Sequence, residues 1–286
     1  MHVAVGDVRL FFDVSGEKLV PNGAEMREKP TVLLLHGGPG FDHSMLKPWF
    51  VELADAAQLI YVEHRGNGRS DRSTADKLNL AQWGDDVRHF CDALEIRDPI
   101  VLGVSFGGFV AQAYATRHPD HPKALILCNT SPRNREDRVL AAFERLGGAE
   151  ARAAAAAYLR EPTAETMSRY ASVCLPHYNR TPQDPNLMVR AMPQANFELS
   201  MQFFRDEFRR FDFLDALAQV RCPTLVLAGE DDAITPLEDS EDIVAALPAG
   251  LAHLERFAHC GHPVYQDDPQ RFFRVFREFV GSLADP

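Results

Sequence analysis

The feature that most constrains this fold is a series of short apolar runs separated by segments with helical periodicity. Four of the runs are apolar along almost their whole length: Thr31–Leu35, Leu59–Val62, Ile100–Val104 and Thr224–Gly229. Two further runs, Ala124–Asn129 and Leu251–Phe257, extend the series. A strand that is apolar on both sides is buried on both faces, as in a parallel sheet covered by helices. Strands that alternate with helices therefore predict an α/β fold with a doubly wound, mostly parallel sheet.

The segments between and beside these runs fit the same architecture. Helical periodicity is found at residues 45–57, 80–94 and 109–117, and in a last amphipathic segment, 270–283. Near the N-terminus, His2–Val5 and Val8–Val14 alternate apolar and polar residues around Gly6-Asp7, which predicts a hairpin at a sheet edge. The polar stretch Glu17–Pro30 predicts a surface excursion.

The series is interrupted between residues 132 and 213, where no strand-like run occurs. This region holds an alanine-rich helix former, Ala149–Leu159, then a loop region punctuated by prolines, and then an amphipathic stretch, Phe197–Phe213. We interpret residues 132–213 as a helical lid inserted over the sheet. Residues 1–131 and 214–286 then form a single core.

Composition narrows the classes of function. Of the 286 residues, 45% are hydrophobic, so the chain can bury a sizeable core. Its 41 acidic and 30 basic residues give a formal net charge of -11, which disfavours nucleic acid and anionic membranes as partners. No apolar run approaches the roughly 18 residues needed to span a bilayer, and no secretory signal is visible, so we expect a cytoplasmic protein.

Metal and disulfide chemistry are not expected. The five cysteines are scattered and lack CxxC spacing, which fits neither a disulfide scaffold nor a zinc ribbon. His118 and His121 lie beside prolines at a predicted helix end, and we interpret them as a solvated cap. We expect no cofactor.

The strongest functional signal is the segment GVSFGG, Gly103–Gly108, which directly follows one strand and precedes a helix. This is the G-x-S-x-G pattern, in which a serine sits on a tight, strained turn from strand to helix. The two flanking glycines allow close backbone packing. We therefore predict that Ser105 is a nucleophile exposed at the carboxyl edge of the sheet.

A serine hydroxyl needs a base, and the base needs a carboxylate that orients it. The run Thr224–Gly229 is followed by two candidate carboxylates, Asp231 and Asp232. After the last strand come two candidate bases, His259 and His262. The residues alone leave both choices open.

With its nucleophile, acid and base in this order, essentially the whole chain resembles the α/β-hydrolase superfamily. The resemblance implies a mostly parallel eight-stranded sheet with helices on both faces and an inserted lid. That family places its acid three residues after a glycine and four before a proline, which selects Asp232. Its histidine follows a glycine and precedes the last helix, which selects His262. A serine at position 105 excludes the relatives that use aspartate there, the haloalkane dehalogenases and epoxide hydrolases.

The segment HGGPG, His36–Gly40, follows the first buried run. Backbone N–H groups of a glycine-rich loop can stabilise a developing oxyanion. We predict that the amides of Gly38 and Phe106 form this oxyanion hole, since Pro39 has no N–H to donate. Neither the P-loop nor the dinucleotide pattern of glycines is present.

HGGPG together with the motif RGxGxS at residues 65–70 resembles the proline iminopeptidase group of aminopeptidases. That resemblance implies that acidic lid residues, here Glu198 and Glu207, bind the amino group of the substrate. The alternative for both is a solvated helix face. The chain departs from the group at Phe106, where tryptophan is usual, and at Glu63-His64, where Asp-Gln is usual.

The sequence thus predicts a serine hydrolase for a small-molecule or short peptide substrate. An aminopeptidase is favoured within this class. Carboxylesterase or lactonase activity and C–C bond hydrolysis by the same triad remain open. The non-enzymatic alternative is a ligand receptor on the same fold. The substrate and the oligomeric state are not predicted.

Overall fold

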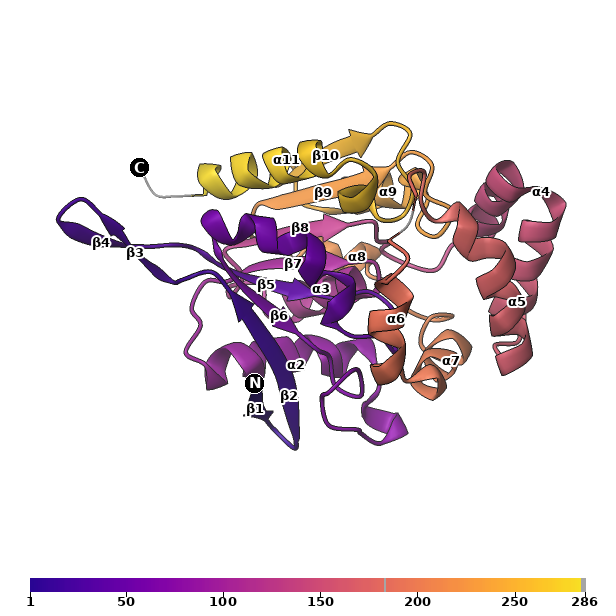
Figure 1. Ribbon diagram of the computed structural model, residues 1–286, viewed down its shortest axis with the longest axis horizontal. Coiled ribbons are helices and arrows are strands. Elements are labelled where there is room, and N and C mark those ends of the chain that lie inside the picture. The colour runs from indigo at the N-terminus through magenta and orange to yellow at the C-terminus, as the bar shows by residue number, and fades with distance from the viewer. Residues whose placement is uncertain (183, 284–286) are drawn as a thin grey trace.

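The computed structural model describes residues 1–182 and 184–283 and contains the expected large sheet. Its eight strands lie in the order β1-β2-β6-β5-β7-β8-β9-β10 (Figure 1). Their bounds are His2–Val5, Val8–Ser15, Gln58–Val62, Thr31–Leu35, Ile100–Val104, Ala124–Cys128, Thr224–Gly229 and Ala252–Phe257, in the same order. The pairs β1–β2 and β2–β6 are antiparallel, and all the others are parallel. The predicted doubly wound sheet is confirmed.

The apolar runs are continuous because both faces of the sheet are covered. Within β5, Leu33 and Leu35 join a core under α2 (Leu80–Ala93), α3 (Phe106–Arg117) and α9 (Leu237–Ala246). The alternate residues of β5 join a second core under α1 (Lys47–Phe50) and α11 (Pro269–Ser282). Successive side chains of a strand point to opposite faces, so each face receives every second residue. Figure 1 shows α11 on one side of the sheet and α2 on the other.

One local expectation holds with added detail, and one needs correction. The polar stretch Glu17–Pro30 does lie on the surface, but it contains a hairpin of β3 (Leu19–Asn22) and β4 (Glu25–Glu28) that projects from the body (Figure 1). Its strands pair only with each other, so their side chains are mostly exposed and show no apolar pattern. The predicted helix at 45–57 is broken into three short turns, His43–Met45, α1 and Val51–Asp55. Pro48, which cannot donate a backbone hydrogen bond, lies in the first turn of α1.

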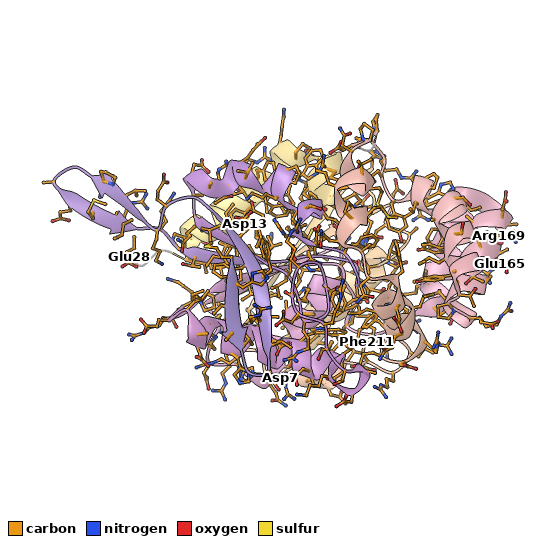
Figure 2. The ribbon with its side chains drawn as sticks, turned by 60° about the horizontal axis from the view of Figure 1, so that its bottom comes forward. Asp7, Asp13, Glu28, Glu165, Arg169 and Phe211 are labelled. Atoms are coloured by element: carbon orange, nitrogen blue, oxygen red, sulfur yellow. The ribbon has the colours of Figure 1, made fainter. Side chains whose placement is uncertain are left out.

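Between β8 and β9 the described residues form helices and turns. The helices are α4 (Glu136–Arg160), α5 (Ala164–Cys174), α6 (Leu187–Ala191), α7 (Phe197–Arg205) and α8 (Leu214–Leu217). The alanine-rich part of α4 packs against α5, with Ala151, Ala154 and Ala155 buried. In Figure 2, Glu165 and Arg169 lie on the outer side of α5, at the end of the molecule opposite the β3–β4 hairpin. The expected amphipathic stretch Phe197–Phe213 is helical only as far as Arg205.

The two ends of this helical region lie next to each other. Phe213 N donates to Pro132 O at 2.8 Å. Farther on, Arg138 of α4 binds two carboxylates of core helix α9, Asp239 at 2.6 Å and Asp242 at 2.8 Å. Burial raises the pKa of Asp239 to about 7, although the guanidinium of Arg138 opposes that rise. One cation therefore joins α4 to a buried carboxyl group whose pKa lies above its ordinary value.

Asp239 should make stability depend on pH. Its pKa in the fold lies above the ordinary value of 3.8, so its contribution to stability is fully present below about pH 4 and is lost as the pH rises through 7. We expect the free energy of unfolding of the wild type, relative to Asp239→Asn, to fall by on the order of a few kcal/mol between pH 4 and 8. Urea denaturation across this range measures the difference. The control Asp242→Asn, which removes the more exposed partner of Arg138, should track the wild type, and a pH-independent difference for Asp239→Asn contradicts the assignment.

Candidate functional site

Ser105 occupies a strained turn between β7 and α3. Its backbone has φ 54° and ψ −117°, a conformation that non-glycine residues rarely adopt. The flanking glycines are required by close backbone approach. A Cβ atom on Gly103 would lie 2.2 Å from Gly107 O, and one on Gly107 would lie 2.1 Å from Leu35 O. The turn can therefore form only where both positions lack side chains.

The turn is held by the neighbouring strands and lies beside the HGGPG segment. Ser105 N donates to Cys128 O at 3.0 Å, and Thr130 Oγ1 donates to Ser105 O at 2.9 Å. A Cβ atom built on Gly37 would lie 3.5 Å from the Cβ atom of Ser105. Ser105 thus lies at the carboxyl edge of the sheet, next to the glycine-rich loop.

Asp232 and His262 meet at the same edge, on the loops that follow β9 and β10. His262 Nδ1 lies 2.9 Å from Asp232 Oδ2, and both side chains are buried. The other oxygen of Asp232 accepts from the amides of Ile234 at 2.7 Å and Thr235 at 3.0 Å. Burial works against the charged form of Asp232, but His262 and these amides outweigh it and hold the pKa of the carboxyl group below its ordinary value. The site therefore holds a buried carboxylate ready to orient the imidazole.

The other acid and the other histidine lie elsewhere. Asp231 faces the helical region between β8 and β9, where it pairs with Arg145 at 2.9 Å and Arg180 at 3.6 Å. His259 is exposed and has a φ of 58°. The structure thus joins Asp232 to His262 and directs Asp231 toward two arginines.

Asn129, which sequence analysis did not select, connects these parts of the site. It lies at the end of β8, and its Nδ2 donates to Asp232 Oδ2 at 2.9 Å and to Gly261 O at 3.3 Å. Its φ of 46° is a left-handed conformation that asparagine tolerates better than most residues. The one sequence feature that points to Asn129 is that this polar residue directly follows a buried strand. In the sheet that strand, β8, lies between β7 and β9.

The two amides predicted to form an oxyanion hole lie at adjacent strand ends. Within the described residues, neither Gly38 N nor Phe106 N donates to a backbone or side-chain acceptor. Residues of two other segments hold the loop around Gly38. Gly40 N donates to Asn67 Oδ1 at 2.6 Å, and Asn196 N donates to Gly40 O at 2.7 Å. A backbone N–H without an acceptor in the protein is what an oxyanion hole requires.

A buried ionic network underlies this loop. Glu63, fully buried, accepts from His43 Nδ1 at 2.7 Å and from Arg69 Nη1 at 2.8 Å. Arg69 also binds the buried Asp42 at 2.8 Å, which ties the loop after β5 to the loop after β6. Sequence patterns did not predict this network, since ion pairs between distant residues leave no local pattern.

The two glutamates predicted to bind an amino group have different surroundings. Glu207 accepts from the amide of Leu80 at 3.1 Å and pairs with Arg210 at 2.8 Å. Glu198 is exposed in the first turn of α7. A surface hollow of about 780 Å³ borders Glu207 but not Ser105 or His262. Binding of an amino group by these glutamates stays a prediction.

Neither a group of metal ligands nor a membrane-spanning helix is present in the described part of the chain. No three His, Cys, Asp or Glu side chains are grouped there as metal ligands would be. His118 pairs with Asp85 at 2.9 Å, and His121 contacts Tyr114. In the same residues, no helix is both long enough and apolar enough to cross a bilayer.

The close packing at Gly107 predicts a large effect of a single methyl group. Gly107→Ala should destabilise the protein by about 2 kcal/mol or more, because its Cβ atom would collide with a backbone carbonyl that cannot rotate away. Gly281→Ala is the matched control, since that Cβ atom would meet nothing within 4 Å and alanine favours the helix by about 0.5–1 kcal/mol. Urea denaturation of both variants tests this, and equal stability would contradict the packing described.

Comparison with known proteins places this geometry in a family. The family described as alpha/beta hydrolase fold matches residues 30–269. A protein of Caulobacter sp. (strain K31) named as a carbamate hydrolase is 28% identical over 264 residues, covering 92% of this chain and 95% of that protein. The proline iminopeptidase PfmaB of Pestalotiopsis fici is 26% identical over 269 residues, covering 88% and 93%.

A solved structure extends the likeness to almost the whole chain. The proline iminopeptidase of Mycobacterium smegmatis superposes with a TM-score of 0.78 over 99% of this chain and 98% of its own, at 23% identity, which is a likeness of fold. The chain belongs to the α/β-hydrolase fold family.

Proposed function

We propose that this protein is a serine hydrolase that cleaves an ester, lactone or amide bond of a small substrate through an acyl-enzyme. The observation that carries the proposal is the buried pair of Asp232 and His262, 2.9 Å apart, at the sheet edge where the strained turn presents Ser105. A strained serine, a histidine and a buried carboxylate are the parts that activation of a hydroxyl nucleophile requires.

In the proposed mechanism, His262 takes the proton of Ser105 as the hydroxyl attacks the substrate carbonyl. Asp232 fixes the imidazole through Nδ1 and stabilises the imidazolium that forms. The amides of Gly38 and Phe106 donate to the oxyanion of the tetrahedral intermediate. His262 then protonates the leaving group, and water hydrolyses the acyl-enzyme by the same route.

We further propose that residues 132–213 are a lid that shapes an apolar pocket. Two aromatic side chains from this region pack on Phe109 of α3. The ring centroid of Phe109 lies 4.8 Å from that of Phe211 (Figure 2) and 6.4 Å from that of Phe203. Phe203 also contacts Phe106 at 5.2 Å, directly beside the nucleophile. These rings are buried in one apolar cluster beside Ser105, which supports a site that excludes water and favours an apolar acyl group.

Within this class we favour an aminopeptidase similar to proline iminopeptidases. The HGGPG segment and the relative of that name support this choice. Glu198 is the better candidate for binding an amino group, because Glu207 already accepts from the Leu80 amide and from Arg210. An ester or lactone substrate would need no such carboxylate.

A fluorophosphonate probe tests the nucleophile. We expect the wild type to label and Ser105→Ala not to label, because the probe reacts only with an activated hydroxyl. Asp232→Asn and His262→Ala should label at least 100-fold more slowly, whereas the neighbouring controls Asp231→Asn and His259→Ala should label within a few-fold of wild type. Folded wild-type protein that fails to label supports the receptor alternative, and equal labelling of Ser105→Ala refutes the proposed nucleophile.

A substrate pair tests the subgroup. We expect proline naphthylamide to be cleaved with a higher kcat/KM than short-chain nitrophenyl esters. Glu198→Gln should raise KM for the naphthylamide by about 2- to 5-fold, the value of one exposed charge pair, and leave KM for the esters unchanged. Glu207→Gln is the comparison variant. Full activity of Glu198→Gln on the naphthylamide would remove the proposed amine contact, and ester preference would favour a carboxylesterase.

A further inference from the structure

The helical region between β8 and β9 returns to the core beside His262, at residues Tyr178–Thr181, which we call the strap. The carboxylate of Asp267 accepts several hydrogen bonds at this contact. Asp267 accepts from Arg180 N at 3.0 Å, from Thr181 N at 2.9 Å and from Thr181 Oγ1 at 2.7 Å. It also accepts from Gly261 N at 2.8 Å, the amide directly before His262. Asp267 thus joins the strap to the loop that carries the base.

A second set of contacts binds His262 itself to the strap. The backbone N–H of His262 donates to Tyr178 O at 2.8 Å, and the two rings meet edge to face with centroids 5.5 Å apart. A Cβ atom on Gly261 would lie 2.0 Å from Tyr178 O, so the two backbones are in close contact. Tyr178 is in turn anchored to α5 by its hydroxyl, 2.8 Å from that of Tyr170.

The strap also reaches the loop that carries the acid. Arg180, whose amide binds Asp267, places its Nε 3.6 Å from Asp231 Oδ2. Arg145 of α4 binds the other oxygen of Asp231 at 2.9 Å. Asp231 directly precedes Asp232 in the sequence. One short segment outside the sheet therefore contacts both loops whose relative position sets the pair of Asp232 and His262.

We propose that the strap and Asp267 position His262, so that the lid holds the base in place for catalysis; this inference rests on the proposed function. The imidazole is hydrogen-bonded to Asp232 of the core, whereas the backbone N–H of His262 donates to Tyr178 O of the strap and that of Gly261 donates to Asp267, which holds the strap. Hydrogen bonds to a charged acceptor are roughly twice as strong as neutral ones, so Asp267 dominates the contact. Asp267 is a positioning residue and does not touch the reacting atoms.

The test measures kcat and KM separately for Asp267→Asn and compares each with the wild-type value. The amide keeps one acceptor but loses the charge that serves four donors, so the loop should relax and displace the base. We expect kcat to fall about 10- to 100-fold and KM to change less than two-fold, because small displacements of a catalytic group cost rate and leave binding intact. Asp268→Asn is the matched control: it removes the adjacent carboxylate, and asparagine caps α11 as well as aspartate does.

A second variant keeps the inference testable if Asp267→Asn fails to fold. Thr181→Val removes only the hydroxyl bonded to Asp267 and should lower kcat by about 2- to 5-fold. In the double variant the two effects on kcat should be less than additive, because both act through the same carboxylate. Melting temperatures and circular dichroism identify the variants that are folded.

Each result decides the matter. A folded Asp267→Asn or Thr181→Val with wild-type kcat overturns the positioning role, and so does an equal loss of kcat in Asp268→Asn or a loss confined to KM. Activity that persists in Ser105→Ala refutes the proposed function itself and removes the basis of this inference. Loss of activity in Ser105→Ala with wild-type kinetics in Asp267→Asn refutes the inference alone.

Discussion

Backbone packing at the end of β7 is the constraint on which the rest of the site depends. The chain turns from β7 into α3 so tightly that Gly103 and Gly107 approach the carbonyls of Gly107 and Leu35 at distances no side chain permits. This contact puts Ser105 into its left-handed conformation and brings it beside the loop after β5. The sheet must be parallel here, since only then do β5, β7 and β9 all end at the edge where the serine lies.

Hydrogen-bond donors and cations then allow charged carboxylates to be buried at this edge of the sheet. Asp232 is buried but surrounded by donors from Asn129, the Thr235 amide and His262. Glu63 and Asp42 are buried but share the guanidinium of Arg69. Burial of an unpaired carboxylate would be strongly unfavourable, so these networks are conditions for the fold as well as for the proposed chemistry. The helical region between β8 and β9 belongs to the same system, because its arginines pair with Asp231 and Asp239.

Sequence patterns predicted the elements that depend on local chemistry. The strand at Thr224–Gly229 has its predicted bounds, because a strand buried on both faces is a continuous apolar run. The last helix was predicted within one residue of Pro269–Ser282, because a helix buried on one side repeats its apolar residues with the helical period. The break of the helix predicted at 45–57 and the hairpin at 17–30 were missed. Both depend on turn geometry and pairing between exposed residues, which hydrophobic periodicity does not record.

The sequence by itself determined the α/β architecture, the serine turn and the order of the candidate nucleophile, acid and base, because each depends on a pattern of neighbouring residues. Only the tertiary structure decided that Asn129 and Asp267 tie the loops of this edge together, and it joins His262 to Asp232, which the family resemblance had already favoured over Asp231. Asn129 lies 103 residues from Asp232 along the chain. Contacts over such separations arise when strand ends are brought to one edge, and no local pattern encodes which side chains then face one another.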